Sequence, residues 1–346
     1  EMYGDNYGYL SSLNNSMVQH LNQKAKYLTD LANLQDGDVV VDIGSNDCTF
    51  LKALPTYTKR IGIDPTIKKF AHYYPEEIYY AADFFSKENY WLIESEKNAK
   101  LVTSISCFYD LDDPVSFVKD IREILTDDGL WHFEQAYLPS TLRATSYDTV
   151  CHEHIEYYSM LSVRKILDLA GMKIVDVTLN DINGGSFAVT ACKDTNKDIP
   201  VNSAVIDWLI EEEYKMGLDT LDPYLQFAER ANTHRDSLIS LLRGLRDAGK
   251  SVYGYGASTK GNVLLQWCGL TSKDITAFGE INPDKYGCVT PGTNIPIISE
   301  SEVKAAKPDY MIVLPWHFKP GILQREKEYR NAGGKFIFPL PYIEIV

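Results

Sequence analysis

The chain has 346 residues, of which 45% are hydrophobic and 24% charged, and its formal net charge is −14. A chain of this length exceeds what one hydrophobic core usually organises, so we expect two domains. The acidic excess argues against a nucleic-acid partner, because phosphate neutralisation requires clustered Lys and Arg. A single basic pocket for a small anionic ligand is still compatible with this net charge. No apolar run approaches the ~20 residues of a membrane span and no signal-peptide pattern is present, so we expect no membrane association.

The cysteines are scattered and never form a C-x-x-C pair. This pattern predicts reduced thiols and a cytoplasmic location, and it weighs against a structural zinc site within the sequence. The six cysteines are Cys48, Cys107, Cys151, Cys192, Cys268 and Cys288.

The first elements predict an α/β domain. Residues 1–20 are rich in Tyr, Gly, Asn and Ser, which indicates an ordered arm, and a helical pattern follows over 16–34. From residue 39, short apolar runs alternate with helical stretches, which is typical of a parallel sheet covered on both faces. The predicted strands are "VVVDIG", "RIGID", "LVTSIS" and "LWHFEQ".

A hairpin, "MKIVDVTLNDINGGSFAVTAC", is expected to close this sheet, and a second section begins near residue 200. That section opens with a long amphipathic helical stretch over about 204–248 and then resumes strand–helix alternation, which predicts a smaller Rossmann-like α/β unit. We therefore expect an arm over 1–30, a first domain over 31–195 and a second over 196–346.

The loop "DIGSND" follows the first predicted strand and indicates a nucleoside-binding edge. Its glycine lets the backbone approach a ligand, and Asp64 ends the next strand, 22 residues after Asp42, where it suits ribose hydroxyls. A dinucleotide loop would show G-x-G-x-x-G, whereas an acid here repels a pyrophosphate and suits the ammonium of an amino acid. The pattern therefore favours S-adenosylmethionine over NAD; the alternative is a generic solvated turn.

Further donor contacts are expected at the third and fourth strand ends, "AADFF" and "SISCFYD". The segment "AADFF" offers an acid and an aromatic ring for adenine. The segment "SISCFYD" faces the transferred methyl group in folds of this kind. The predicted cofactor residues are Asp42, Gly44, Asn46, Asp47, Asp64, Pro65, Asp83, Phe84, Ser106, Cys107 and Phe108.

The stretch "VCHEHIEYYS" at 150–159 concentrates ionisable side chains. A zinc protease helix needs H-E-x-x-H, whereas His152 and His154 would point in different directions on a helix, and the pattern supplies no third or fourth ligand. The alternative is an ordinary polar loop in which one histidine has its hydrogen bonds made within the protein. We favour acid–base chemistry, because His titrates near neutrality and a neighbouring Glu can orient it.

Several motifs occur in one order along essentially the whole sequence: "MYGDNYGYLSSLNNSMVQHL", "DIGSNDCTFL", "CHEHIEYYS", "NGGSF", "YGYGASTKGNVLL" and "VLPWHF". Together they resemble the sugar C-methyltransferases, which methylate nucleotide-linked 4-keto-deoxysugars. The resemblance implies that a base removes the proton beside the ketone and that the enolate attacks the sulfonium methyl group.

The resemblance also implies residue roles. The E-H pair of the motif corresponds to Glu153 and His154, with His154 as the base and Glu153 orienting it or protonating the enolate. A tyrosine of the arm, Tyr7 or Tyr9, would hydrogen-bond the enolate oxygen. His152 completes the catalytic candidates.

The sequence departs from the family pattern at several positions. Cys151 stands where members carry a tyrosine, Asn183 replaces the histidine of "HGGS", and His317 replaces the asparagine of "PWN". Members also begin with a four-cysteine zinc module, so structural zinc is expected only if such a module precedes this sequence.

The second section offers an anion site at "GYGASTKGN", where a helix start follows a strand. The resemblance implies a site for the nucleotide diphosphate of the substrate; a turn with Gly for packing is the alternative. An NAD site would use Glu280 for the ribose. The predicted substrate residues are Asn183, Gly184, Ser186, Tyr255, Ser258, Lys260, Asn262, Trp316 and His317, with Lys319 at the rim.

We therefore expect a methyltransferase domain of class I followed by a smaller α/β domain, and C-methylation at a carbon beside a ketone. The carbon, C3 or C5, the nucleotide and the oligomeric state stay open. The alternatives are an O- or N-methyltransferase, an NAD-dependent oxidoreductase built on the second domain, and a non-catalytic nucleotide-binding module.

Overall fold

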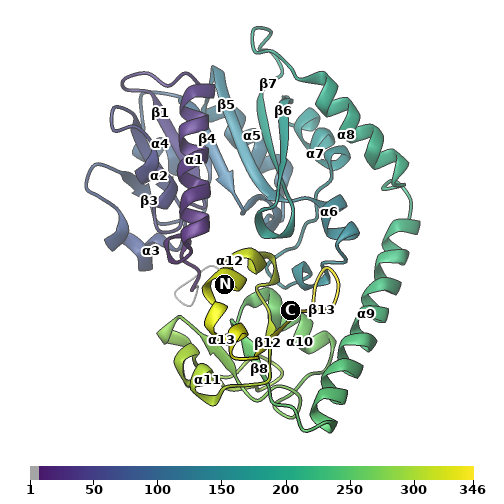
Figure 1. Ribbon diagram of the computed structural model, residues 1–346. Helices are drawn as coiled ribbons and strands as arrows, with labels where there is room; N and C mark the ends of the chain where they lie inside the picture. Colours follow the sequence, from purple (N-terminus) through teal and green to yellow (C-terminus); the bar gives the residue numbers. More distant parts are fainter. Residues whose placement is uncertain (1–7) are drawn as a thin grey trace. The chain divides into compact units, whose positions relative to one another are not determined.

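The computed structural model describes residues 8–346, which form two compact units (Figure 1). The first unit comprises residues 8–137, 155–181 and 186–215, and the second comprises 138–154, 182–185 and 216–346. The units are therefore interleaved along the sequence. Segments 138–154 and 182–185, which the sequence analysis assigned to the first domain, lie with the second unit.

The first unit is built on a seven-stranded sheet with the order β3-β2-β1-β4-β5-β7-β6. Strands β1 to β5 are parallel, and the β6–β7 hairpin joins antiparallel to β5, as expected from the sequence. The strands are β1 (Val39–Ile43), β2 (Lys59–Ile63), β3 (Tyr79–Ala81), β4 (Ala99–Ile105), β5 (Leu125–Ala136), β6 (Met172–Asn180) and β7 (Ser186–Lys193).

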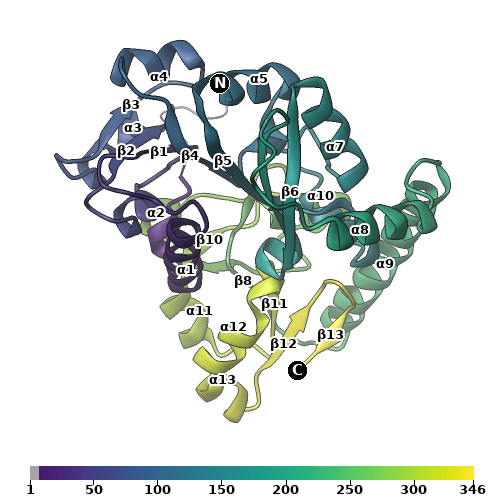
Figure 2. The same cartoon turned by 90° about the horizontal axis from the view of Figure 1, so that it is seen from above.

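Helices cover both faces of this sheet; Figure 2 shows α4, α5 and α7 on one face and α1 on the other. The amide of Ser16 donates to the Asn14 side chain, which caps α1, and the buried residues of that helix recur at three and four. The helices are α1 (Asn15–Leu31), α2 (Thr49–Ala53), α3 (Ile67–Phe70), α4 (Lys87–Ile93), α5 (Pro114–Ile124), α7 (Met160–Leu169) and α8 (Ser203–Lys215).

The second unit has a six-stranded sheet with the order β10-β9-β8-β11-β12-β13, in which only β13 is antiparallel. A Cβ on Gly254 of β8 would lie 2.0 Å from the ring of Phe278, so glycine permits β8 and β9 to pack around that ring. The strands are β8 (Val252–Tyr255), β9 (Phe278–Glu280), β10 (Ile297–Ser299), β11 (Tyr310–Val313), β12 (Lys335–Phe338) and β13 (Glu344–Ile345).

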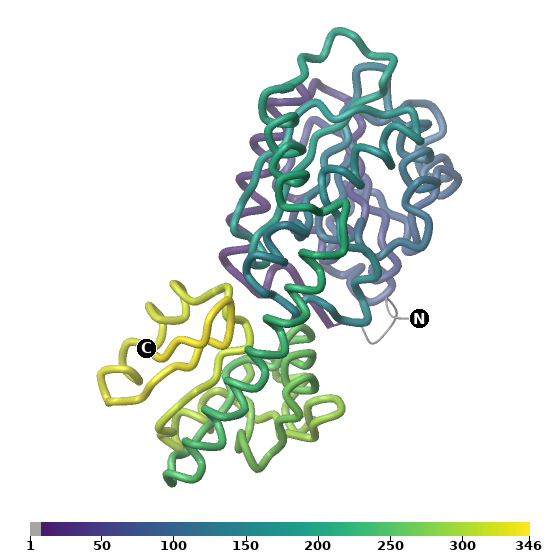
Figure 3. The backbone as a smooth tube through the Cα atoms, turned by 90° about the vertical axis from the view of Figure 1, so that its right-hand side faces the viewer, coloured from purple at the N-terminus to yellow at the C-terminus, as the bar shows by residue number. Residues whose placement is uncertain are grey.

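The helices of the second unit include the longest described helix, α9, whose tube is seen in Figure 3. They are α6 (Leu138–Arg143), α9 (Asp222–Asp247), α10 (Thr259–Trp267), α11 (Glu300–Ala306), α12 (Lys319–Arg325) and α13 (Lys327–Asn331).

The helical stretch predicted over about 204–248 consists of two helices, because α8 ends at Lys215 and α9 begins at Asp222. Gly217 has a φ of +72°, which no right-handed helix adopts, and Pro223 lies in the first turn of α9, where its missing N–H costs no helical hydrogen bond. The amphipathic pattern continues across both helices, and for that reason periodicity alone does not reveal the break.

No helix within residues 8–346 is both long enough and apolar enough to cross a membrane.

Candidate functional site

The first candidate site is the carboxyl edge of the seven-stranded sheet. Gly44 leaves β1 with a φ of +73°, and a Cβ there would lie 3.2 Å from the Cys107 sulfur. The Cys107 thiol itself donates to the Ile43 carbonyl at 3.4 Å, and burial raises its pKa well above the usual range. The loop after β1 therefore packs directly against the end of β4, which requires the glycine.

Asp42 points into the protein near the end of β1. Its carboxylate is buried and accepts from the Thr103 hydroxyl at 2.6 Å. Burial raises the pKa of Asp42 to about 7, opposed by the Thr103 hydrogen bond and assisted by the nearby Asp64 charge. A carboxyl group held in this way braces β1 against β4.

Asp64, predicted to bind ribose, organises the loop in this structure. One oxygen accepts from the Asn46 amide at 2.8 Å, and the other accepts from the amide and hydroxyl of Thr66 at 2.6 Å each. A carboxylate has about four acceptor positions, so three donors leave room for one more. Bidentate ribose binding therefore requires a ligand to replace one of these bonds. Pro65, directly after it, is half-buried.

The N-terminal arm is attached to the same loop. The amide of Ser11 donates to Asn46 Oδ1 at 3.2 Å, the amide of Ser12 donates to Asp47 Oδ2 at 2.8 Å, and Asn46 Nδ2 donates to the Tyr9 carbonyl at 3.0 Å. Asn46 and Asp47, both predicted to bind the methyl donor, are thus hydrogen-bonded to the arm. Tyr9 is 47% exposed; Tyr7 lies outside the described residues.

The remaining donor candidates divide into exposed and buried positions. Phe84 is 61% exposed beyond β3, where its ring is accessible, and the neighbouring Asp83 accepts from the Phe84 amide at 2.8 Å. Ser106 adopts a φ of +59° after β4. Phe108 instead lies in the core at 1% exposure, stacked on Tyr158 at 4.9 Å, so its predicted ligand contact is replaced by packing.

A buried ionic cluster at the exit of β5 was not predicted as a site. Glu134 is 1% exposed and lies 2.5 Å from both His20 Nε2 and Lys24 Nζ, while Asn180 donates to it at 2.9 Å. Burial alone would raise the pKa of Glu134, but the His20 hydrogen bond and the Lys24 charge outweigh it and lower the pKa to about 2. Glu134 stands at the end of a predicted strand, so its place was visible in the sequence. Its partners on α1, His20 and Lys24, lie more than 100 positions away, and no local pattern connects them to it.

The second candidate site lies in the second unit, around the loop of residues 150–154. The His154 amide donates to the Cys151 carbonyl at 3.2 Å, which closes a turn and brings these side chains together. His154 Nδ1 donates to the Thr149 carbonyl at 2.9 Å, since a carbonyl can only accept, and this places the imidazole lone pair on Nε2. His152, by contrast, is exposed.

Lys260, at the start of α10, is the cation of this site. Its charge acts on Asp148, Cys151 and Glu153, and burial lowers its own pKa. Burial first, and then the Lys260 charge, lower the pKa of His154 to about 4 and that of His317 to about 3. Both histidines are therefore neutral at pH 7, beside a fixed positive charge.

Trp316 joins three segments that are distant in the sequence. Its Nε1 donates to Asp148 Oδ2 at 2.8 Å, and a Cβ on Gly184 would lie 3.1 Å from its ring. Asn183 beside it has a φ of +54°. Asp148 is 2% exposed, its other oxygen has no hydrogen-bond partner among the described residues, and burial raises its pKa. Asp148 was missed because "YDTV" carries no recognisable motif.

Two further predicted substrate residues, Ser258 and Tyr255, have structural partners. Ser258 caps α10 by accepting from the Gly261 amide at 3.1 Å, and the Tyr255 hydroxyl donates to Glu326 at 3.0 Å. Asn262 is on α10, and its Oδ1 is buried without a hydrogen-bond partner in the described part of the protein. Ser186 begins β7 in the first unit.

Glu280, the ribose acid of the NAD alternative, is engaged by its own surroundings. It accepts from the amides of Ala257, Ile281 and Asn282, at 3.0, 2.8 and 3.1 Å. Lys285 pairs with the same carboxylate at 3.4 Å. These bonds do not favour a dinucleotide at β8.

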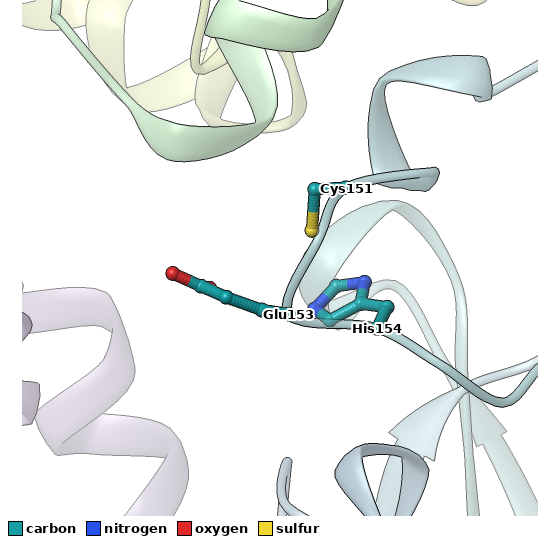
Figure 4. A group of neighbouring side chains, drawn as sticks. All are labelled: Cys151, Glu153 and His154. Carbon is teal, nitrogen blue, oxygen red and sulfur yellow. The ribbon is translucent and has the colours of Figure 1, made fainter. Parts of the chain in front are cut away.

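Three donor atoms of the catalytic loop come close together. One ligand atom each of Cys151, Glu153 and His154 lies within 4.8 Å of the other two. Figure 4 shows these three side chains on their loop. The metal alternative was judged from the histidines and glutamates of this stretch, without Cys151 as a ligand. Cys151 lies in the same ten residues and departs from the family pattern. This departure was the sequence signal that could have pointed to a third donor atom.

The strand order of the first unit, with its antiparallel β7 inserted between β5 and β6, is that of the class I methyltransferases, which bind S-adenosylmethionine at the carboxyl edge. Residues 17–177 match the family described as "Methyltransferase domain", and residues 181–341 match the "C-methyltransferase C-terminal domain". The fold and these matches together define an S-adenosylmethionine-dependent methyltransferase.

A curated relative indicates which kind of methyltransferase this is. The "C-methyltransferase NovU" of Streptomyces niveus is 33% identical over 343 residues, which cover 98% of this protein and 81% of the relative. The protein therefore belongs to the S-adenosylmethionine-dependent C-methyltransferases, and carbon rather than oxygen or nitrogen is the atom methylated.

Solved structures are more distant. The protein resembles a putative methyltransferase in complex with the Haloferax volcanii Trm112 activator, with 14% identity, a TM-score of 0.41, and coverage of 52% of this sequence and 94% of that one. It also resembles an S-adenosylmethionine-dependent methyltransferase from Clostridium acetobutylicum, with 11% identity, a TM-score of 0.40, and coverage of 51% and 92%.

Proposed function

We propose that this protein methylates a ring carbon of a nucleotide-diphosphate 4-keto-deoxysugar, with His154 as the base that removes the proton on the carbon beside the ketone, at C3. The observation that carries the proposal is the hydrogen bond from His154 Nδ1 to the Thr149 carbonyl. It fixes the tautomer in which Nε2 accepts a proton, next to Glu153 and the Lys260 charge.

Lys260 gives substrate binding a way to make His154 a stronger base. With a pKa of about 4, free His154 is a poor proton acceptor at pH 7. Burial is the larger cause of this low pKa and the Lys260 charge the second, and an anionic diphosphate or a developing enolate beside Lys260 offsets the second. Substrate binding therefore raises the basicity of His154 at the moment when the proton is transferred, and the ammonium stabilises the enolate oxygen.

The methyl donor is assigned to the carboxyl edge of the seven-stranded sheet. The exposed Phe84 ring supports stacking on adenine, and Asp64 has one acceptor position available for ribose. Asn46 and Asp47 contact the donor after exchanging their bonds to the arm. In the second unit, Asn262, Trp316, His317 and Asn183 hold the sugar and its diphosphate. The six free cysteines support a reducing, cytoplasmic setting.

The test follows the proton beside the ketone. The enzyme is incubated with 4-keto-6-deoxy nucleotide sugars in deuterated water, and the ring protons are followed by NMR with and without S-adenosylmethionine. We expect one ring proton to exchange without the donor, and a carbon-bound methyl to appear with it.

Variants assign the base. His154→Asn is expected to lose both exchange and methylation, by about 100-fold or more, whereas His152→Asn, which changes the exposed histidine of the same loop, is expected to keep both. Exchange that persists in His154→Asn, or no exchange with any nucleotide sugar, would contradict the proposal.

A further inference from the structure

Cys151 changes the chemistry of the loop that carries the acid–base pair. Its thiol, a Glu153 carboxylate oxygen and a His154 ring nitrogen lie within 4.8 Å of one another (Figure 4). All three come from one four-residue turn, closed by the bond from the His154 amide to the Cys151 carbonyl. The turn therefore keeps the three side chains on one short stretch of backbone.

Sulfur, imidazole nitrogen and carboxylate oxygen are the donors that Zn²⁺ uses in proteins, and three protein ligands with one open position are typical of accessible zinc sites. Bond lengths of about 2.0–2.3 Å place tetrahedral ligands about 3.5 Å apart. From a separation of 4.8 Å, each donor atom has to move by about 1 Å to reach that spacing.

One neighbouring contact favours metal binding. The Thr149 carbonyl accepts from His154 Nδ1 at 2.9 Å, and such a bond to the second ring nitrogen is what orients ligating histidines in metal sites. Burial raises the pKa of Cys151 and favours its thiol form, which opposes metal binding, although the backbone amides of Glu153 and His154 and the Lys260 charge act the other way. The same Lys260 charge repels a cation, which limits the affinity.

We propose that Cys151, Glu153 and His154 bind one borderline divalent cation such as Zn²⁺, and that the bound ion switches off the base. Binding converts the Cys151 thiol to a metal thiolate and releases its proton to solvent. The metal also takes the imidazole lone pair that would accept the substrate proton. The inhibitory half of this proposal rests on the proposed function, and the binding half does not.

Cobalt spectroscopy tests the binding half. The chelator-treated protein is titrated with Co²⁺ alone, and the thiolate-to-cobalt band in the near ultraviolet and the ligand-field bands in the visible are recorded. We expect saturation at one equivalent. Cys151→Ser, which replaces only the sulfur, should lose the near-ultraviolet band and weaken binding by about 100-fold.

Cys288→Ser is the matched control, because Cys288 is the exposed cysteine of the same unit. It should retain the complete spectrum, and circular dichroism of both variants verifies that they fold. No band in the wild type, or a band that persists in Cys151→Ser, would overturn the binding half.

Inhibition is measured separately with the exchange assay. One equivalent of Zn²⁺ should lower ring-proton exchange by about tenfold or more, a chelator should restore it, and Cys151→Ser should resist inhibition. Activity that rises with Zn²⁺, or that is unaffected at a saturated site, would overturn the inhibitory half. A cobalt spectrum without exchange of any nucleotide sugar would contradict the proposed function and still support the metal site.

Discussion

Lys260 sets the protonation of the side chains around it. Its charge acts on two acids and a thiol, and it lowers the pKa values of His154 and His317. Sequence motifs suggested a phosphate contact for this lysine, but they could not place it beside the catalytic loop, because α10 and that loop are about 100 positions apart. One cation thereby contributes to the lowered pKa values of two histidines of the candidate site.

We predict that Lys260→Met raises the pKa of His154 in the free enzyme. The positive charge disfavours the imidazolium form, so removing it moves the titration from about 4 toward higher pH. The measurement is an NMR titration of the labelled imidazoles, with His154→Asn to assign the signal. Lys273→Met, which changes an exposed lysine of the same unit, should leave that titration in place; an unchanged or lowered pKa in Lys260→Met contradicts the assigned role.

Helix α1 is fastened to the sheet by the ionic cluster at Glu134. His20 and Lys24 reach from α1 to the end of β5, and the arm that precedes α1 bonds to the loop after β1. A buried charge is tolerated here because each oxygen of Glu134 has charged or amide partners. The cluster therefore orients the arm over the donor edge as well as anchoring the helix.

We predict a loss of stability in acid that depends on Glu134. Its folded pKa of about 2 lies below the unfolded value of about 4.3, so the carboxylate contributes stability above pH ~5 that is lost as the pH falls toward 2. The contribution is about 3 kcal/mol. Urea unfolding at pH 6 and pH 3.5 measures it.

Glu134→Gln should be less stable at pH 6 and should show a flatter dependence on pH. Glu211→Gln, which changes an exposed glutamate of the same unit, should follow the wild type. Parallel pH dependence in Glu134→Gln and the wild type would show that the cluster does not contribute as described.

At the level of elements, local patterns predicted the sheets well and the helix break poorly. Val39–Ile43 is buried at every position, and such a run identifies a parallel strand from sequence alone. The break at Gly217 leaves the amphipathic pattern unbroken. In the site, Cys151 and Glu153 are local to one motif, whereas the pairing of Asp148 with Trp316 joins residues 168 positions apart, which no local signal encodes.

For the whole molecule, each unit has its own hydrophobic core and its own sheet. A ligand that binds only one folded unit stabilises that unit by mass action, by about 2.7 kcal/mol at a concentration of 100 Kd. Because the donor edge belongs to the first unit, its stability should respond to S-adenosylhomocysteine independently of the second.

We predict two calorimetric transitions, of which one rises in temperature as S-adenosylhomocysteine is added. Asp64→Ala, which removes the acceptor at the donor edge, should weaken this response, whereas Glu280→Ala at the corresponding edge of the second unit should leave it intact. An equal shift of both transitions would mean that the units unfold as one.

The interleaving of the units limits how this protein can be recombined with its relatives. The loop with Glu153 and His154 is a feature of the second unit, yet it is spliced into the sequence between β5 and α7 of the first. A chimaera that exchanges only the carboxyl-terminal segment 216–346 therefore separates Lys260 and Trp316 from the loop segment whose side chains they act on. To transfer the second unit intact, residues 138–154 and 182–185 have to be exchanged together with that segment.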